Sequence, residues 1–183
     1  GRFNMTDRLP PQDREAEKAV LGAILIDNNA INPVVEILKE SDYYREAHKK
    51  IYATMLERHQ KQEAIDLITL VNALKKADNL AKVDGIAYIS GLLNTIATSA
   101  NVKYHAEIVR DKSILRKLIT ISAEIAQKAY DGNIETKEQL DQAEKNIIQI
   151  TSNQTTTDYT MAHDMLGAMM DKLQAVASGQ DTA

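Results

Sequence analysis

The chain has 183 residues, a formal net charge of −4 at pH 7 and no cysteine. The lack of cysteine excludes disulfides, thiolate zinc sites and cysteine nucleophiles, and the negative net charge gives no overall basic field for nucleic acid. The longest apolar run, residues 19–26, is far below the roughly 20 residues that span a bilayer, and no signal peptide is visible, so we expect a cytoplasmic protein of one domain plus an appendage.

The first hundred residues predict a small helical head behind a short tail. Residues 1–9 are expected to be an expression tag and a disordered N-terminus, because four residues precede Met5. In residues 10–100, apolar side chains at three- and four-residue spacing predict five short helices. These helices are residues 12–25, 27–38, 44–59, 67–77 and 86–96, with Asp27 and Asp66 as N-caps. Short helices with short connections are typical of a compact bundle.

Residues 101–150 predict a long antiparallel helical hairpin. Asn101 is a suitable cap for the first helix, Gly132 is a suitable terminator, and Thr136 with Gln139 has the form of a capping box for the return helix. At about 1.5 Å per residue, the hairpin makes an arm roughly 30–45 Å long. The first helix carries more apolar surface than a hairpin can bury by itself. We therefore expect the arm to pack against the head or a second chain.

Residues 151–159 predict a flexible linker, because residues 151–157 contain no apolar side chain. Residues 160–177 predict one amphipathic helix capped by Thr160, followed by a frayed end at 178–183. An isolated helix of this length is marginal in water. Two interpretations stay open: a partner-seeking helix, which its adaptable methionines favour, or a further core helix that folds back. The predicted fold class is therefore all-α.

The sequence offers no catalytic site. It contains no glycine-rich phosphate loop, neither G-x-x-x-x-G-K-[ST] nor G-x-G-x-x-G. The spacing of its four histidines does not suit a metal, and we expect His48 and His105 to be buried, hydrogen-bonded residues of the head. Glu15 and Glu17 are expected on a solvated helix face.

The densest basic patch lies on the first helix of the hairpin and comprises Arg110, Lys112, Arg116 and Lys117. Such a patch is typical of a solvated helix face, and no aromatic residues alternate with it as they do on platforms for single-stranded nucleic acid. It leaves a rival function open, that of a stand-alone helical module that binds nucleic acid.

Six segments in unbroken order resemble a known family. They are PPQDREAEKAVLGAILID (10–27), YYREAHKKIYATMLE (43–57), IDLITL (65–70), GIAYISGL (85–92), NVKYHAEIVRDKSILRKLI (101–119) and LDQAEKNIIQI (140–150). Together they resemble the N-terminal region of the bacterial replicative DNA helicase, the DnaB family. The resemblance covers residues 10–150 and does not extend to the RecA-like motor, which we expect to follow residue 183.

The resemblance implies a non-catalytic assembly and docking region. Arms of two subunits pair, three dimers form a collar above a hexameric motor ring, and the collar receives primase. The helix after the linker packs on the motor domain of a neighbouring subunit. ATP and magnesium are expected only in that motor, so no cofactor is expected here. A helicase loader is a further implied partner, contact with DNA would be indirect or weak, and a helicase-loader adaptor is a further alternative function.

Three groups of residues carry these expectations. For primase docking they are Tyr88, Ile119 and Ile125; because the two isoleucines are six residues apart, one can face a partner while the other packs inward. For arm pairing they are Leu140, Ala143, Ile147 and Ile150, which in the alternative only close the hairpin. For docking of the linker helix they are Met165, Met169 and Leu173.

Overall fold

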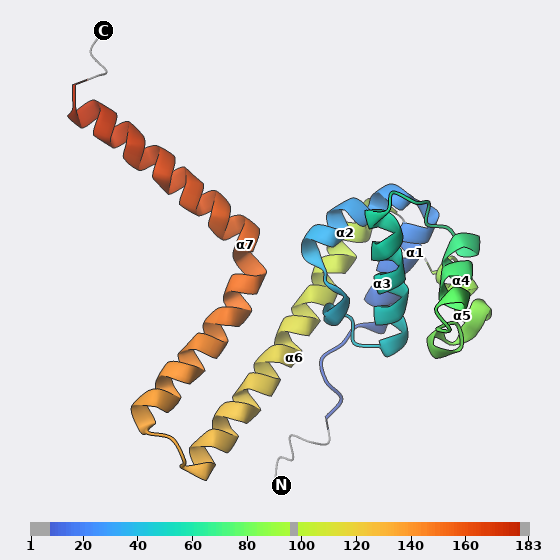
Figure 1. The fold of residues 1–183 in the computed structure, drawn as a ribbon, viewed down its shortest axis with the longest axis horizontal. Helices are drawn as coiled ribbons and strands as arrows, with labels where there is room; N and C mark the ends of the chain where they lie inside the picture. The colour runs from blue at the N-terminus through green and yellow to red at the C-terminus, as the bar shows by residue number, and fades with distance from the viewer. Residues whose placement is uncertain (1–7, 96–98, 180–183) are drawn as a thin grey trace. The chain divides into compact units, whose positions relative to one another are not determined.

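The structure is a computed structural model that describes residues 8–95 and 99–179, apart from the side chains of Ser99 and of residues 153–166. All regular structure in the described residues is helical (Figure 1). The α-helices are α1 (Arg14–Ile26), α2 (Ile31–Ile37), α3 (Glu46–Gln60), α4 (Leu67–Lys76), α5 (Gly85–Leu92), α6 (Val102–Asp131) and α7 (Thr136–Ala177). Short 3₁₀ helices lie at Asn28–Ala30, Glu40–Asp42, Ala81–Val83 and Ser99–Asn101. The all-α prediction is confirmed.

The chain forms two compact units, which we call the head unit (Gly1–Arg116) and the arm unit (Lys117–Ala183). Helix α6 contributes its first half to the head unit and its second half to the arm unit. The head unit therefore extends beyond the predicted boundary at residue 100. The physical reason is that Val102, Ala106 and Val109, at helical spacing on α6, are buried in the core of the head unit. None of the described helices combines the length and apolarity needed to cross a membrane.

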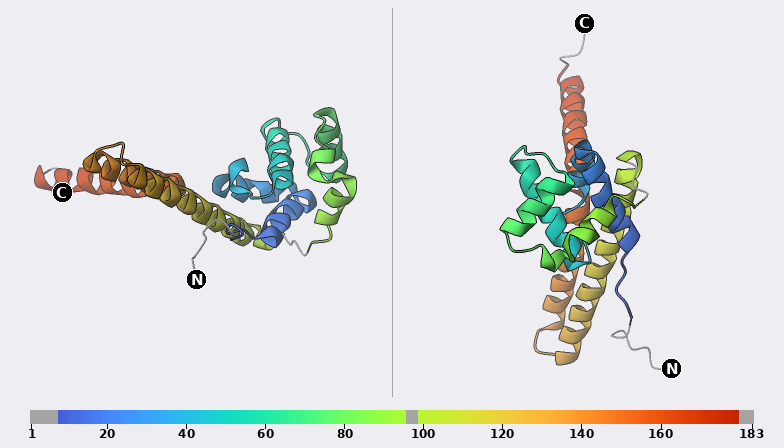
Figure 2. Two further views of the ribbon diagram at one scale, coloured as in Figure 1. Left: turned by 90° about the horizontal axis from the view of Figure 1, so that it is seen from below. Right: turned by 90° about the vertical axis from the view of Figure 1, so that its right-hand side faces the viewer.

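The core of the head unit is centred on α1, which is buried on nearly all sides over residues 19–25. On α1, Val20, Leu21 and Ile24 are completely buried, and Asp13 caps the helix by accepting a hydrogen bond from the Ala16 amide at 2.9 Å. Helices α3 and α5 pack against α1, and α4 packs against α3 and α5; Figure 2 shows these helices from two further sides. Each fully buried aliphatic side chain stabilises such a core by about 1.5–3 kcal/mol.

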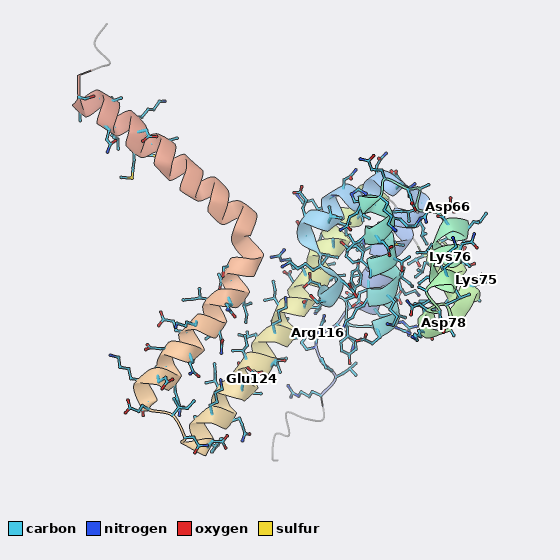
Figure 3. All side chains as sticks on the ribbon, viewed as in Figure 1. Asp66, Lys75, Lys76, Asp78, Arg116 and Glu124 are labelled. Atoms are coloured by element: carbon cyan, nitrogen blue, oxygen red, sulfur yellow. The ribbon has the colours of Figure 1, made fainter. Side chains whose placement is uncertain are left out.

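Both N-caps predicted from the sequence, Asp66 and Asp27, cap helical turns of the head unit. Asp66 caps α4, because its carboxylate accepts from the Thr69 amide at 2.8 Å while the Thr69 hydroxyl accepts from the Asp66 amide at 3.0 Å. Figure 3 labels Asp66 at the start of α4 and Lys75 and Lys76 in its last turn, so the charges oppose the helix dipole at both ends. Asp27 caps the first 3₁₀ turn by accepting from the Asn29 amide at 3.0 Å.

The arm unit contains a helical hairpin. Helix α6 ends where Gly132 adopts a left-handed conformation with φ +63°, a conformation that glycine takes without steric cost. The capping box predicted for the return helix is not formed. Helix α7 begins at Thr136 with Glu135 as its N-cap residue and no side-chain cap bond, while the side-chain amide of Gln139 donates instead to the Ile134 carbonyl at 3.0 Å.

Helix α7 runs without interruption through residues 151–159, where a linker was predicted, and through Thr160, where a new helix start was predicted. The physical reason is that this stretch contains neither proline nor glycine. The hydroxyls of Thr151 and Ser152 donate to the carbonyls of Ile147 and Ile148, at 3.2 and 2.7 Å, so polar side chains are accommodated in the helix. The flexibility of the stretch stays a prediction.

Candidate protein-interaction surfaces

The outer surface of the arm unit is rich in apolar side chains. On α6, Ile119 keeps 48% of its surface exposed, and Leu118 is exposed beside it. On α7, Leu140 and Ile147 keep 66% and 46% exposed, and Ile148 is also exposed. Large aliphatic side chains gathered on one element at such exposures are uncommon on a monomer and mark interaction surfaces.

The inner side of the hairpin is where α6 and α7 face each other. Ile125 of α6 and Ala143 of α7 are half-buried and line the same small cavity of about 20 Å³. At the same level, the Lys128 ammonium donates to the Gln142 side-chain carbonyl at 3.5 Å. The two docking isoleucines of the sequence analysis thus differ in surroundings: Ile119 faces outward, and Ile125 packs toward α7.

The four residues assigned to arm pairing divide in the same way. Leu140 and Ile147 are exposed, whereas Ala143 and Ile150 are half-buried. Spacing alone placed all four in one seam. The structure adds that these four side chains are covered to different extents, with Ala143 lining the small cavity that it shares with Ile125 of α6.

The C-terminal part of α7 presents a second apolar surface. Met169 and Leu173 keep 59% and 64% of their surfaces exposed, and Met170 and Val176 are similarly exposed. The side chain of Met165, the third residue assigned to linker-helix docking, lies outside the described residues. Unbranched methionine side chains adapt to irregular partner surfaces.

The basic patch on α6 is partly committed to the head unit. The Arg110 guanidinium donates to the Ile37 carbonyl at 2.9 Å. The Arg116 guanidinium, labelled in Figure 3, donates to the carbonyls of Pro11 and Asp42, both at 2.7 Å, and burial lowers the pKa of Arg116. Ser113 lies between them and donates to the Asp42 carboxylate at 2.8 Å. Two of the four cations of the basic patch therefore bind backbone carbonyls of the head unit.

A buried polar chain crosses the head unit from α1 through α3 to α5. Glu17, only 2% exposed, accepts a hydrogen bond from His48 Nδ1 at 2.8 Å, and His48 Nε2 lies 2.6 Å from the Tyr88 hydroxyl. The expectation of a solvated Glu17 is wrong, because Glu17 lies on the stripe that includes Val20 and Ile24 and finds donors inside the head unit. His48 is buried as expected, whereas His105 is only half-buried.

Tyr88, assigned to docking, stands at the outer end of this chain and is half-buried. Its ring lies 5.4 Å from the Arg45 guanidinium carbon, and Arg45 also pairs with Asp84 at 3.1 Å. No pattern in the sequence connects these residues, because they come from three separate elements. The ring of Tyr88 is therefore held by His48 at its hydroxyl and by Arg45 over one face.

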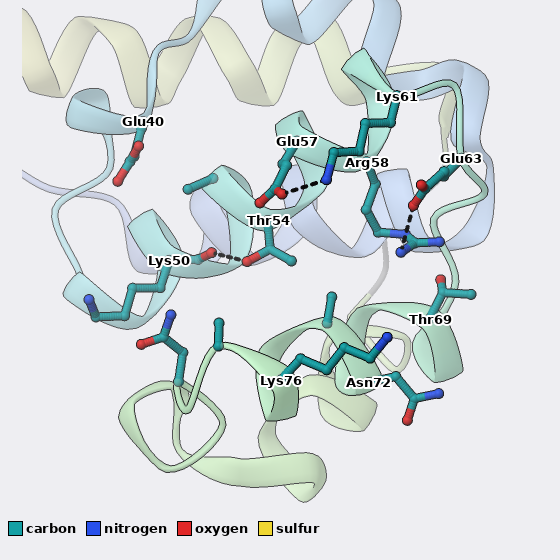
Figure 4. Close-up of a pocket in the computed structure, with 14 residues that line it drawn as sticks. Glu40, Lys50, Thr54, Glu57, Arg58, Lys61, Glu63, Thr69, Asn72 and Lys76 are labelled. Atoms are coloured by element: carbon teal, nitrogen blue, oxygen red, sulfur yellow. Dashed lines mark hydrogen bonds and ion pairs between the residues drawn. The ribbon is translucent and has the colours of Figure 1, made fainter.

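A polar groove of about 750 Å³ separates α3 from α4 (Figure 4). Its charged residues include two ion pairs, Lys61 with Glu57 at 2.9 Å and Arg58 with Glu63 at 3.1 Å. The Glu57 carboxylate raises the pKa of Lys61, and Lys61 lowers that of Glu57. Across the part of the chain that the structure describes, no group of three or more metal-ligating side chains comes together. The groove thus presents paired surface charges.

Comparisons of the sequence and of the structure with known proteins agree on one family. Residues 9–111 match the family model described as DnaB-like helicase N terminal domain. The replicative DNA helicase DnaC of Bacillus subtilis (strain 168) is 39% identical over 170 residues, which are 93% of this chain and 37% of that protein. The chain therefore spans little more than a third of that curated relative.

Two solved structures share the fold. The crystal structure of the N-terminal domain of DnaB helicase from Mycobacterium tuberculosis matches with a TM-score of 0.73 and 34% identity, over 77% of this chain and 99% of that one. A structure of a DnaB-like replicative helicase, which describes its interactions with primase, matches with a TM-score of 0.61 over 82% of this chain and 35% of that one. Its identity is 24%, so this second likeness concerns the fold alone.

Proposed function

Because the chain belongs to the DnaB-like helicase N-terminal domain family, we propose that it is the non-catalytic assembly and docking region of a replicative DNA helicase. The whole protein is then an ATP-dependent enzyme that unwinds DNA in the cytoplasm. The observation that carries the proposal is the apolar outer surface of the arm unit, which includes Ile119, Leu140 and Ile147. Water contact with so much aliphatic surface is unfavourable, and a partner that covers it gains about 25 cal/mol for each Å² removed from water.

The first occupant of this surface is a second copy of the chain. Leu140 and Ile147 are seven residues apart on α7 and share a face, as residues on the seam of paired helices do. Pairing of two arm units would form a dimer, and three dimers would form the collar of a hexameric helicase. The half-buried Ala143 and Ile150 would support this pairing from the same face of α7.

The second partner is primase. Ile119 offers an exposed aliphatic side chain on α6, and Tyr88 offers a fixed aromatic ring on the head unit. A DnaB-like helicase of the same fold interacts with primase, which supports the choice of partner. Ile125 then acts indirectly, by packing toward α7 and fixing the orientation of α6. A helicase loader is a further candidate for the same exposed surfaces.

The third contact uses the C-terminal part of α7. Met169 and Leu173 would dock on the motor domain of a neighbouring subunit, with Met165 continuing the same helix face at four-residue spacing. The residues of this chain do not fit an ATP–magnesium site, because the sequence lacks a glycine-rich phosphate loop. ATP and magnesium would therefore bind in the motor domain of the whole helicase.

Self-association is tested by light scattering at rising concentrations of the full chain. The wild type should exceed its monomer mass of 20.4 kDa, and Leu140→Glu should shift it toward the monomer. Gln149→Glu is the matched control, because it adds the same charge at an exposed polar position half a helical turn away from Leu140. A monomeric wild type at all concentrations would contradict arm pairing.

Primase docking is tested by the affinity of primase from the same organism for the full chain. Ile119→Glu should weaken binding tenfold or more, on the order of the loss for an interface anchor, while Gln127→Glu, an exposed position on another face of α6, should leave it unchanged. Equal effects of both variants would contradict a docking role for Ile119. Strong, salt-dependent binding of single-stranded DNA by the wild type would favour the nucleic-acid-binding alternative instead.

A further inference from the structure

Helix α3 begins without a capping side chain of its own. Its N-cap residue, Arg45, makes no side-chain cap bond. Instead, the carboxylate of Glu17 on α1 accepts from the backbone amides of Tyr44 at 3.0 Å and Arg45 at 3.5 Å. A carboxylate at this position satisfies free amides and opposes the positive end of the helix dipole. Glu17 therefore caps α3 from another helix.

The same carboxylate sets the hydrogen-bonding roles of His48. Because Glu17 Oε1 accepts from His48 Nδ1 at 2.8 Å, the proton of a neutral imidazole lies on Nδ1. His48 Nε2 is then an acceptor, and the Tyr88 hydroxyl, 2.6 Å away, donates to it. His48 is completely buried, so each of its ring nitrogens is paired inside the protein.

Tyr88 is held at two points by this arrangement. Its hydroxyl points inward to His48, and Arg45 lies over its ring while pairing with Asp84. Arg45 is itself anchored, because its backbone amide donates to Glu17. Both restraints on Tyr88 therefore lead back to one buried carboxylate. The part of Tyr88 left for a partner is the remaining surface of its ring.

Resting on the proposed function, we propose that Glu17 and His48 are positioning residues that hold the ring of Tyr88 for capture of primase. Tyr88 meets an apolar surface of that partner through its ring, and its hydroxyl acts only through His48. A pre-positioned aromatic side chain binds more tightly because less conformational freedom is lost on binding. Loss of the Tyr88 hydroxyl and loss of its acceptor on His48 should therefore weaken primase binding to the same extent.

The test uses two substitutions of His48 with different reach. Asparagine places its amide near the position of Nδ1, so His48→Asn keeps a donor for Glu17 and loses the acceptor for Tyr88. Glutamine reaches the position of Nε2, so His48→Gln restores an acceptor for the hydroxyl. The affinity of the full chain for primase is measured for these variants, for Tyr88→Phe and for the double variant that combines His48→Asn with Tyr88→Phe. Circular dichroism verifies that each is folded.

Tyr88→Phe and His48→Asn should each weaken binding about threefold to tenfold, as expected for loss of one hydrogen bond. Tyr88→Phe should add nothing in the His48→Asn background, and His48→Gln should bind within about twofold of the wild type, well below the effect of that lost bond. If the losses of affinity of the two single variants added up in the double variant, the hydroxyl would contact the partner directly. That result would overturn the proposal. Unchanged affinity of His48→Asn would overturn it as well.

A second readout separates this proposal from the proposed function. In the absence of primase, the Tyr88 hydroxyl proton should give a slowly exchanging NMR signal in the wild type and in His48→Gln but not in His48→Asn. If that pattern holds and the wild type fails to bind primase, the proposed partner is wrong and positioning for primase is overturned with it. If the wild type binds primase and the signal is absent, only the positioning proposal is overturned.

Discussion

The head unit buries an apolar core, whereas the described residues of the arm unit form none. In the head unit, residues such as Leu21, Ile51 and Leu70 are completely buried. In the arm unit, no side chain that the structure describes is fully buried, and Leu140 and Ile147 remain exposed. The stability of the head unit is therefore explained by its own residues, whereas the proposed function assigns the exposed aliphatic side chains of the arm unit to contacts with other molecules.

The largest difference between the units should come from matched leucines. Leu70→Ala on α4 removes a fully buried side chain and should lower the free energy of unfolding by about 2–5 kcal/mol. Leu140→Ala on α7 removes a side chain that is 66% exposed and should change it by less than about 0.5 kcal/mol in the monomer. Urea denaturation at low protein concentration measures both. Similar losses of unfolding free energy for the two variants would contradict the difference between the head unit and the arm unit.

A second comparison uses two glutamates of α1. Glu17→Ala leaves the buried donor of His48 and the amide of Tyr44 without their acceptor and should lower the free energy of unfolding by about 2–3 kcal/mol. Glu15→Ala removes an exposed carboxylate paired with Lys18 at 3.7 Å and should cost less than about 0.5 kcal/mol. Thermal unfolding of both variants measures the difference. If the two midpoints coincided, Glu17 would have no special structural role.

A helix cap in the head unit should have a smaller effect that depends on pH. Asp66→Ala should lower the free energy of unfolding by about 1 kcal/mol at neutral pH. The Thr69 amide lowers the pKa of Asp66 from its ordinary 3.8, so this stabilisation is fully present above that pH and is lost as the pH falls through the lower, folded value. Asp66→Asn is the control, since it keeps a cap without a titrating group. Urea denaturation between pH 2 and pH 7, roughly the range over which a carboxyl titrates, tests both.

The smallest effect should separate two tyrosines of the same core. The rings of Tyr43 and Tyr52 lie 4.9 Å apart, and burial raises the pKa of both hydroxyls. The Tyr52 hydroxyl donates to the Leu38 carbonyl at 2.9 Å, whereas the buried Tyr43 hydroxyl has no hydrogen-bond partner among the described residues. Tyr52→Phe should cost about 1 kcal/mol and Tyr43→Phe about zero or less. Calorimetric unfolding ranks the two, and a reversed order would refute the assignment.

Local signals made much of the fold predictable from the sequence. Asp66 and Gly132 mark helix ends through interactions with residues three or four positions away, which a sequence displays directly. The surplus apolar surface of α6 was likewise visible from its spacing, and the structure leaves Ile119 exposed. At residues 151–159 the sequence did not indicate that α7 continues, because polar residues without proline or glycine weaken a helix without stopping it.

The polar chain of the head unit was not predictable in the same way. Glu17 meets its partners from a distance of 27 to 31 residues along the chain, and Tyr88 lies 40 residues beyond His48. A signal was nevertheless present, since a carboxylate in line with Val20, Leu21 and Ile24 occupies a buried stripe. The division between Ile119 and Ile125 also required the structure, because spacing does not tell which side the return helix covers.

The cap that Glu17 supplies to α3 has a consequence for the order of folding. The first turn of a helix is its costly step, and the backbone that enters α3 is held by Glu17 of α1, from which it is separated by α2 and two 3₁₀ helices. Glu17 can stabilise this turn only after the two helices have docked, so a peptide of α3 alone should be weakly helical. Nucleation of α3 is thereby coupled to collapse of the bundle, which links the head unit into one cooperative transition.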